Sequence, residues 1–467
     1  MSATDMFRRT FLLGTLALSS TVALGAPKPS GRHPNIIFIL ADDMGYGDAS
    51  VYGQLKIRTP NIDRLAKEGM RFTQGYAGAP VCAPSRCALM TGMHTGHCRV
   101  RDNFALAAGH VGHKNTEEIR RASLTPEDHT VAEYLKANGY HTGLMGKWHL
   151  DGYDPEATPN KLGFDEFKGW LTQIGSTQGY WPEKRVYNEQ LIDIPENANG
   201  RHGRYDTTMI TEDSIDFITR NKAEPFFLYV AYDAPHSPYT ASPDFGPYAN
   251  HPTWADDEKS YAAMIYYMDR GIGRILDTLK HANLDDETII FFASDNGPRS
   301  EPTVEQTRVV DFFDSNGGLT GYKRDMYEGG IRDPWVARWP GHIPAGVVSE
   351  VPVYFPDFLP TALDLAGAPT PQSDGVSLRP FLLDPKRKAE DRVMYWEFYE
   401  PEFRQAVRWG KWKAVRLMRG GPLELYDVAI DPWESKNIAA DHPDTVAKME
   451  QAMAREHVAS PEYPDPL

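Results

Sequence analysis

The sequence predicts an α/β fold, in which a large and mostly parallel sheet with helices on both faces precedes a small antiparallel sheet with one helix. The first observation is a set of three nearly continuous apolar runs of strand length, as expected for strands that are buried on both faces. They span residues 35–41, 225–231 and 288–293. The second is that helix-like segments separate these runs, which is typical of a parallel α/β sheet.

The helices expected in this first part of the chain span residues 59–69, 130–138, 211–221 and 261–281. After about residue 375 the pattern changes to short aromatic-rich runs at the spacing of hairpin strands. These runs span residues 392–398, 404–409, 411–417 and 422–427, and a last helix is expected over 442–457. We therefore divide the chain into a leading segment 1–26, an α/β domain 27–375 and a C-terminal antiparallel subdomain 376–467.

The charge balance limits the kinds of partner. The 467 residues include 49 Lys and Arg against 64 Asp and Glu, a formal net charge of −15. A chain this acidic has no overall field for holding nucleic acid or an anionic membrane, so we expect no nucleic-acid partner. Any anionic substrate has to be held by a local cationic pocket that works against the global charge.

The first 26 residues have the order of an export signal. Arg8 and Arg9 precede an apolar run, residues 11–24, which ends in small residues. The run is too short for a membrane span, and the arginine pair resembles a twin-arginine signal. An ordinary secretory signal that carries two arginines is the alternative. We expect an exported protein, periplasmic or secreted, with no membrane span in its mature form.

Polar residues follow each apolar run, where the predicted strand ends. Asp42 and Asp43 follow the first run, and His236 lies just beyond the second. Asp295 and Asn296 follow the third. Ligand sites in open α/β sheets lie beyond the carboxyl ends of the strands, so we expect these residues to converge. Their oxygen-rich set suits calcium or magnesium, although each pair alone is also typical of an ordinary turn.

Cysteine occurs only three times, in one short segment, so disulfides do not organise this fold. Pro84 suits the first turn of a helix and Gly92 its end, which places Cys82 at the helix N-terminus. The unpaired N–H groups there, with Arg86 one turn further on, suit an oxyanion. The alternative is a buried cysteine beside a surface arginine.

Two further segments carry cations. Lys147 and His149 would lie on the same side of an extended chain, and would supply one fixed charge and one group able to exchange protons near neutral pH. Lys323 lies in a loop that precedes two glycines. Each of these signals is weak alone, because a Lys-x-His pair is usually a solvated face of a strand.

Together, these segments carry the resemblance to a known family. The pattern Cys-x-Pro-Ser-Arg with a following Thr-Gly occupies residues 82–92, and Gly-Tyr-x-Thr-x-x-x-Gly-Lys-x-His occupies residues 139–149. The chain thereby resembles the type I, formylglycine-dependent sulfatases of the alkaline phosphatase superfamily. The similarity extends over essentially the whole chain after residue 26.

The resemblance implies an alkaline-phosphatase-like fold and a role for each residue. Cys82 would be oxidised by a maturation enzyme to formylglycine, whose hydrated aldehyde is the nucleophile. Arg86 and Lys147 would position the aldehyde hydrate and the sulfate, and His149 would take a proton when the covalent sulfate intermediate collapses. His236 and Lys323 would contact the sulfate ester. A calcium ion, with magnesium as the alternative, would be held by Asp42, Asp43, Asp295, Asn296 and residue 82.

The substrate is predicted only by class, as a sulfated polysaccharide or oligosaccharide, with a free aryl sulfate as the alternative. Candidate contacts to it are His94, His97, Arg99, Arg101, Trp170 and Trp181. Three other readings stay open at this point. They are a phosphate or phosphonate ester hydrolase of the same superfamily, a catalytically silent protein that binds sulfated glycans, and a cysteine hydrolase that uses Cys82 as a thiol.

Overall fold

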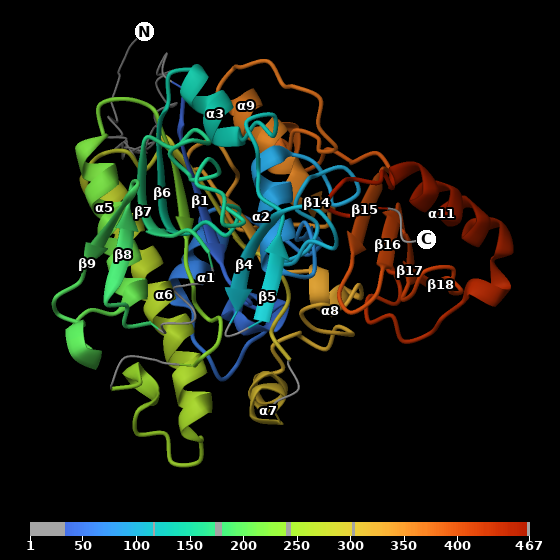
Figure 1. Cartoon of the computed structure of the whole chain (residues 1–467), viewed down its shortest axis with the longest axis horizontal. Coiled ribbons are helices and arrows are strands. Elements are labelled where there is room, and N and C mark those ends of the chain that lie inside the picture. The colour runs from blue at the N-terminus through green and yellow to red at the C-terminus, as the bar shows by residue number, and fades with distance from the viewer. Residues whose placement is uncertain (1–32, 115–116, 173–179, 240–243, 301–303, 465–467) are drawn as a thin grey trace, which may run out of the picture. The chain divides into compact units, whose positions relative to one another are not determined.

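The computed structural model describes residues 33–464 apart from four short gaps, at 115–116, 173–179, 240–243 and 301–303 (Figure 1). Its largest element is a ten-stranded sheet with the strand order β13-β2-β12-β11-β1-β10-β6-β7-β8-β9. The strands from β11 to β7 run parallel, and antiparallel strands extend the sheet on both sides. In sheet order, the ten strands span Val347–Ser349, Met70–Phe72, Trp335–Arg338, Thr288–Ser294, Asn35–Ala41, Phe226–Ala231, His141–Lys147, Glu166–Trp170, Lys184–Tyr187 and Gln190–Asp193.

The central strand β1 explains why the first apolar run is continuous. All seven of its residues are buried, and alternate side chains enter two different cores. Ile36 and Phe38 belong to one core, while Ile37 and Ile39 belong to the other. A strand covered on both faces favours apolar side chains along its length, and the one polar residue of β1, Asn35, stands at its first position and donates to Thr288 Oγ1.

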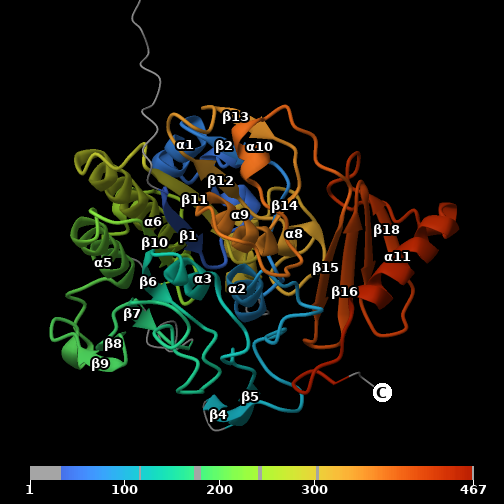
Figure 2. The same cartoon turned by 90° about the horizontal axis from the view of Figure 1, so that it is seen from above.

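Helices cover both faces of the sheet, as Figure 2 shows. The first core is covered by α2 (Cys82–Thr91), α3 (Val131–Ala137) and α9 (Phe358–Leu365). The second is covered by α1 (Pro60–Lys67), α5 (Asp206–Arg220) and α6 (Asp256–His281). Further helices are α7 (Val304–Phe313), α8 (Glu328–Ile331) and α10 (Arg379–Leu383). The predicted fold class is confirmed.

The main differences from the predicted elements lie at helix starts and sheet edges. α5 begins at Asp206 and α6 at Asp256, each five residues before the predicted start at 211 or 261. Both helices open with acidic residues, which stabilise a helix N-terminus but do not contribute to an apolar period. The outer strands β8 and β9 were not predicted, because neither contains an apolar run: β9 is largely exposed, and the one fully buried residue of β8 is the charged Arg185.

The C-terminal part forms the predicted antiparallel sheet and helix, at the right of Figure 1. Its strands are β15 (Val393–Phe398), β16 (Arg404–Trp409), β17 (Trp412–Arg416) and β18 (Glu424–Asp427), and its helix is α11 (Pro443–Glu456). One face of this sheet packs Val407 against Met453 of α11. The opposite face packs Trp396 against the main part of the protein, in a core that includes Tyr76 and Cys82. Two small ribbons pair β3 (Gly75–Tyr76) with β14 (Val353–Tyr354) and β4 (His110–Lys114) with β5 (Glu117–Arg121).

Two predictions about the ends of the domains are not tested by this architecture. The leading segment 1–26 lies outside the described residues. The division at residue 375 stays a prediction. Within the described ranges, no helix combines the length and the apolar character needed to cross a membrane.

A buried ion cluster joins the small sheet to the loops of the main sheet. Lys413 Nζ, in β17, lies 2.9 Å from Glu328 Oε1 and 2.8 Å from Glu434 Oε1, with all three side chains buried. Tyr76 donates to Glu328 Oε2 at 2.7 Å, and the Glu328 backbone N–H donates to Glu434 Oε2 at 2.6 Å. Since Glu328 opens α8, this cluster anchors the segment that follows Lys323.

Replacing Lys413 by methionine is expected to lower the free energy of unfolding by about 3–5 kcal/mol at pH 7, because buried carboxylates would lose their counter-charge. Burial raises the pKa of Glu328, but Lys413, Arg332 and Arg408 outweigh it and hold that pKa at about 2, below its usual 4.5. The stabilisation from this ionised group is therefore present above pH 4.5 and is lost as the pH falls toward 2. The deficit of the variant should accordingly be smaller at pH 4 than at pH 7.

Urea unfolding at both pH values measures this difference. The matched control is Lys411→Met, whose exposed side chain pairs with Asp427 at the protein surface, and it should cost less than about 1 kcal/mol. Equal losses in the two variants would contradict a stabilising role for the buried cluster.

Candidate active site

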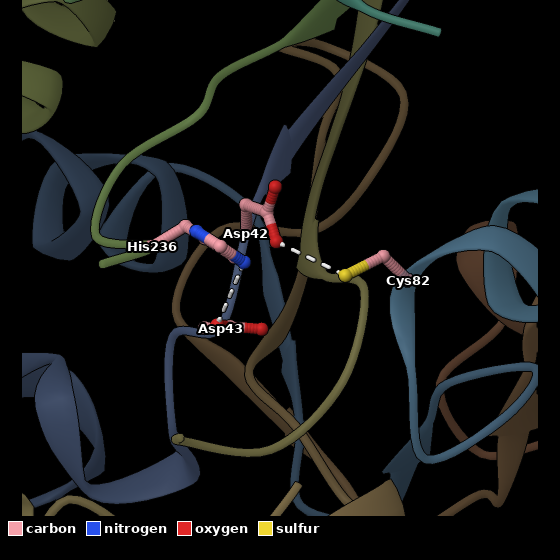
Figure 3. A group of neighbouring side chains, drawn as sticks. All are labelled: Asp42, Asp43, Cys82 and His236. Atoms are coloured by element: carbon pink, nitrogen blue, oxygen red, sulfur yellow. Dashed lines mark hydrogen bonds and ion pairs between the residues drawn. The ribbon is translucent and has the colours of Figure 1, made fainter. Parts of the chain in front are cut away.

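The polar residues that follow β1, β10 and β11 meet at one edge of the sheet, because these neighbouring strands run parallel. The backbone N–H of Asp43 donates to Asp295 Oδ1 at 3.2 Å, and Asn296 Nδ2 donates to Asp43 Oδ1 at 2.8 Å. His236 Nε2 lies 3.6 Å from Asp43 Oδ2 (Figure 3). The structure thus brings together residues from three separate parts of the sequence.

Cys82 is the first residue of α2, and its side chain points toward Asp42 (Figure 3). Its Sγ lies 3.5 Å from Asp42 Oδ1 and 3.4 Å from Lys323 Nζ. The helix ends before Gly92, which adopts the left-handed conformation with φ at 71°. Burial raises the pKa of the Cys82 thiol to about 12. The unmodified side chain is therefore a neutral thiol at pH 7.

Two further cations reach the same group from α2 and β6. Arg86, one turn beyond Cys82, places Nη2 at 2.9 Å from Asp295 Oδ2 and at 3.4 Å from Asp42 Oδ2. Its Nη1 donates to the backbone carbonyl of Lys147 at 2.8 Å. Lys147 Nζ forms an ion pair with Asp42. These contacts fix both cations in buried positions.

The charges decide the protonation states of the group. Lys323 Nζ lies 2.6 Å from Asp43 Oδ1. Burial opposes the ionisation of Asp42 and Asp43, but Lys147 next to Asp42 and Lys323 next to Asp43 lower the pKa of both carboxyl groups. Burial disfavours the charged form of His236 as well, and because that form is the protonated one, the pKa of His236 falls to about 4. At pH 7 the two aspartates are ionised and His236 is neutral.

The oxygen atoms of this group fit a hard cation. Asp43 Oδ2 and Asn296 Oδ1 are buried and accept no hydrogen bond from the part of the chain that the structure describes. One ligand atom from each of Asp42, Asp43, Cys82 and His236 lies within 4.8 Å of the others. Buried oxygen atoms need a hydrogen-bond donor or a cation, and carboxylate-rich oxygen sets suit calcium or magnesium.

His149 has a partner that sequence reasoning missed. It lies two residues beyond the end of β6, and its backbone φ is 65°. Arg121 Nη1, at the end of β5, lies 3.0 Å from His149 Nε2. A single arginine in a polar segment gives no periodic signal, so the sequence did not indicate this contact.

The residues predicted to contact substrate have partners within the protein. Arg101 Nη1 lies 2.8 Å from Glu397 Oε1, and Trp170 Nε1 donates to Asp206 Oδ2 at 3.0 Å. None of these contacts involves the residues at the strand ends. The same holds for the ion pair of Arg99 with Asp128 and for the ring stacking of Trp181 on His202.

His94 and His97 form a second group, with Asp374, in which one ligand atom from each residue lies within 4.8 Å of the others. The backbone N–H of Gly96 donates to His94 Nδ1 at 3.1 Å, so the proton of the neutral ring lies on Nε2. That nitrogen faces Glu456 Oε2 at 3.3 Å. It has no lone pair for a metal, and we interpret the group as a hydrogen-bond network.

Comparison with known families agrees with this geometry. A family model described as Sulfatase matches residues 34–368, and a model described as N-sulphoglucosamine sulphohydrolase, C-terminal, matches residues 319–459. Among curated relatives, N-acetylgalactosamine-6-sulfatase of Sus scrofa is 35% identical over 431 residues, which are 89% of this chain and 77% of the relative. Arylsulfatase A of Homo sapiens is 33% identical, over 90% of this chain and 86% of the relative.

A solved structure is similar over the same extent. The crystal structure of Ps i-CgsB in complex with k-i-k-neocarrahexaose has a TM-score of 0.74 and 30% sequence identity. The match covers 91% of this chain and 92% of that one. The similarity therefore includes both the large sheet and the C-terminal sheet.

Proposed function

The chain belongs to the sulfatase family of the alkaline phosphatase superfamily and is a sulfatase enzyme; from this premise we propose that it releases inorganic sulfate from a sulfated glycan by means of a formylglycine derived from Cys82. One observation carries the proposal. Cys82 Sγ lies at a helix N-terminus, 3.5 Å from Asp42 Oδ1 and 3.4 Å from Lys323 Nζ, within a buried group of alternating charges.

The proposed metal ligands are Asp42, Asp43, Asp295, Asn296 and residue 82, and the proposed ion is calcium, with magnesium as the alternative. The buried oxygen atoms of Asp43 and Asn296 that accept no hydrogen bond from the described residues support this assignment. When present, the ion would neutralise charge on sulfate oxygens, and the hydrated aldehyde would supply one hydroxyl for attack on sulfur and a second for the release of sulfate.

The charges of the protein groups account for sulfate binding in a chain with a net charge of −15. Three buried carboxylates are balanced by three buried cations, so a divalent ion leaves the site positive toward a sulfate ester. Arg86 and Lys147 are held in place by their carboxylate partners and orient the anion. The carboxylates of this set are Asp42, Asp43 and Asp295, and the cations are Arg86, Lys147 and Lys323.

Lys323 is the proposed proton donor to the leaving alcohol. His236 also borders the site, but its Nδ1 lies 2.5 Å from the carbonyl oxygen of Ser237, an arrangement in which Nδ1 carries the proton. Its Nε2 then bears the lone pair in the neutral ring, and it contacts the ester without donating. Lys323 Nζ carries protons and reaches both Asp43 and residue 82.

The raised pKa of Cys82 argues against a thiol enzyme. A cysteine nucleophile acts as the thiolate, which requires a lowered pKa. Burial instead raises the pKa of Cys82 to about 12. Oxidation of this side chain to an aldehyde removes the need for a thiolate, so thiol-reactive inhibitors should leave the mature enzyme active.

The proposed substrate class rests on the names of similar proteins. N-acetylgalactosamine-6-sulfatase is named for a sulfated amino sugar, and the solved Ps i-CgsB complex contains neocarrahexaose, a sugar oligomer. We therefore propose a sulfated saccharide as substrate. An aryl sulfate serves as a simpler probe of the same reaction.

Release of inorganic sulfate, measured by ion chromatography, tests this function on protein produced with a formylglycine-generating maturation enzyme. We expect sulfate release from one or more sulfated saccharides and a higher kcat/KM for an aryl sulfate than for the matching aryl phosphate. A preference for the phosphate would favour a phosphoryl hydrolase. Binding of sulfated saccharides without release of sulfate from any substrate would favour a silent binding protein.

We also propose that the enzyme is exported by the predicted signal at residues 1–26, after the maturation enzyme has acted in the cytoplasm. The arginine pair Arg8 and Arg9 motivates this order, because twin-arginine signals carry folded proteins. Cell fractionation checks it. Replacing both arginines by lysine should retain mature, active enzyme in the cytoplasm, and unchanged export would contradict a twin-arginine route.

A further inference from the structure

The helix that carries Cys82 begins without a capping side chain of its own. Its N-cap residue is Val81, whose side chain has no atom that can accept a hydrogen bond. The first backbone N–H groups of a helix have no partner within the helix, and a Ser, Thr, Asp or Asn at the N-cap usually satisfies one of them. The N–H of Ala83, in the first turn of α2, therefore depends on an acceptor from another part of the chain.

Asn103 supplies this acceptor from a position 20 residues further along the sequence. The N–H of Ala83 donates to Asn103 Oδ1 at 3.2 Å, and both residues are buried. Because a backbone N–H can only donate, the side-chain amide of Asn103 has to present its oxygen atom here. Asn103 thus does for α2 what an N-cap side chain does for other helices, and the N–H of Ala83 is not available to an anion.

This hydrogen bond acts on residue 82 through the geometry of the peptide bond. The N–H of Ala83 lies in the same planar group as the Cα and the carbonyl group of Cys82. Asn103 therefore restrains the plane from which the side chain of residue 82 projects, with its Sγ 3.5 Å from Asp42 Oδ1. A rotation of this plane would move the reacting atom relative to the charged groups that surround it.

The loop that carries Asn103 is fixed by the segment that follows α11. The N–H of Asn103 donates to Asp102 Oδ1 at 2.6 Å. The hydroxyl of Tyr463 accepts from the N–H of Asp102 at 3.1 Å and donates to the carbonyl oxygen of Asp102 at 3.3 Å. Tyr463 is fully buried, and its ring centroid lies 4.8 Å from that of Tyr399. One hydroxyl thus holds both backbone groups of the residue before Asn103.

We propose that Asn103 is a positioning residue that fixes the peptide plane of residue 82, and that Tyr463 holds Asn103 in place for this role. The inference rests on the proposed function, in which residue 82 forms the bond to sulfur. The role requires no proton transfer by Asn103 and leaves the proposed chemistry of the other site residues unchanged.

Steady-state kinetics with an aryl sulfate tests the positioning role, with each preparation normalised to its content of formylglycine. Asn103→Leu keeps a side chain of similar size that cannot accept a hydrogen bond. We expect this variant to lower kcat by about 10- to 100-fold, because a small misplacement of a reacting group is costly. KM should change little, since Arg86 and Lys147 keep the carboxylate partners that hold them in place.

Thr130→Val is the matched control, because it removes the capping hydroxyl of a different helix. Thr130 is the N-cap of α3 and accepts from the N–H of Glu133 at 3.2 Å. None of the candidate active-site residues belongs to α3. Thermal melts should show a loss of stability in both variants, since each leaves a helix N-terminus without its acceptor. Only Asn103→Leu should lose turnover.

Hydrogen exchange at the Ala83 amide provides a readout that does not depend on activity. NMR of the full chain labelled with ¹⁵N-alanine follows this amide, and Ala83→Ser assigns its signal. A buried, hydrogen-bonded amide exchanges slowly. We expect slow exchange in the wild type and in Thr130→Val, and faster exchange in Asn103→Leu.

Tyr463→Phe tests the second part of the proposal, because it removes the hydroxyl and keeps the ring. We expect faster exchange at Ala83 and a smaller loss of kcat than in Asn103→Leu. If Tyr463 acts through Asn103, the double variant should lose no more kcat than Asn103→Leu alone. A fully additive loss in the double variant would overturn the role of Tyr463.

Three results would overturn the role of Asn103, namely an unchanged kcat in Asn103→Leu, an equal fall in kcat in Thr130→Val, or unchanged exchange at Ala83 in Asn103→Leu. A raised KM at unchanged kcat would also overturn it, and would indicate a direct contact with the substrate. Faster exchange at Ala83 in Asn103→Leu, together with a wild type that releases no sulfate, would refute the proposed function and with it the effect on turnover. The contact between Asn103 and Ala83 would then still be established.

Discussion

Replacing Cys82 by serine is expected to lower turnover by about 10³-fold or more, because the side chain at this position is proposed to form the bond to sulfur. A serine hydroxyl could accept the sulfate group, but it offers no second hydroxyl through which carbon–oxygen cleavage would release it. The variant should therefore be inactive or should retain a single sulfate after reaction. Steady-state assays and intact-protein mass spectra measure the two quantities.

Cys87→Ser is the matched control, since Cys87 is buried in the same helix and belongs to the apolar core. It should keep its turnover while losing some stability. A Cys82→Ser variant that turns over at the rate of the wild type would contradict the proposed mechanism, whatever its stability.

Removal of the proposed metal ion is expected to produce the second large effect. Exhaustive chelation should lower kcat by about 10²- to 10³-fold, because charge on the sulfate oxygens would lose its main electrostatic partner. It should also lower the melting temperature, since an ion that binds the folded state stabilises it. Added calcium should restore both quantities. Activity assays and thermal melts follow the titration.

Asn296→Ala tests the same ion by removing one of its proposed ligands. It removes Asn296 Oδ1, a buried oxygen that accepts no hydrogen bond from the described residues, so more calcium should be needed for half-maximal activity and for the thermal shift. Asn138→Ala, at the exposed end of α3, is the control and should titrate like the wild type. A melting temperature that does not respond to calcium in the chelated wild type would contradict the metal assignment.

The central strands and the group at their ends were predictable from the sequence for one physical reason. Strands buried on both faces need continuous apolar runs, and polar residues can follow only where the strand leaves the core. The run 35–41 therefore coincides with β1, and Asp42 and Asp43 lie at its end. Parallel pairing then places these residues beside Asp295 without further information.

Contacts made by isolated charged residues were not predictable. Arg121 and Lys413 each reach a partner through tertiary packing, and neither belongs to a periodic pattern. The candidate substrate contacts, which stay a prediction, show the same limit. In the sequence, Arg101 and Trp170 are a polar and an aromatic group that could contact a substrate. In the structure, Arg101 pairs with the buried Glu397, and Trp170 donates to the buried Asp206. A linear sequence cannot distinguish a paired side chain from an open one.

The proposed mechanism depends most directly on the chemical state of residue 82. Trypsin releases the peptide Phe72–Arg86, which contains this position, and its mass spectrum distinguishes an aldehyde from a thiol. In protein produced with a formylglycine-generating enzyme, we predict a peptide in which formylglycine replaces Cys82. An unmodified cysteine in a preparation that still releases sulfate would contradict the mechanism proposed for this enzyme.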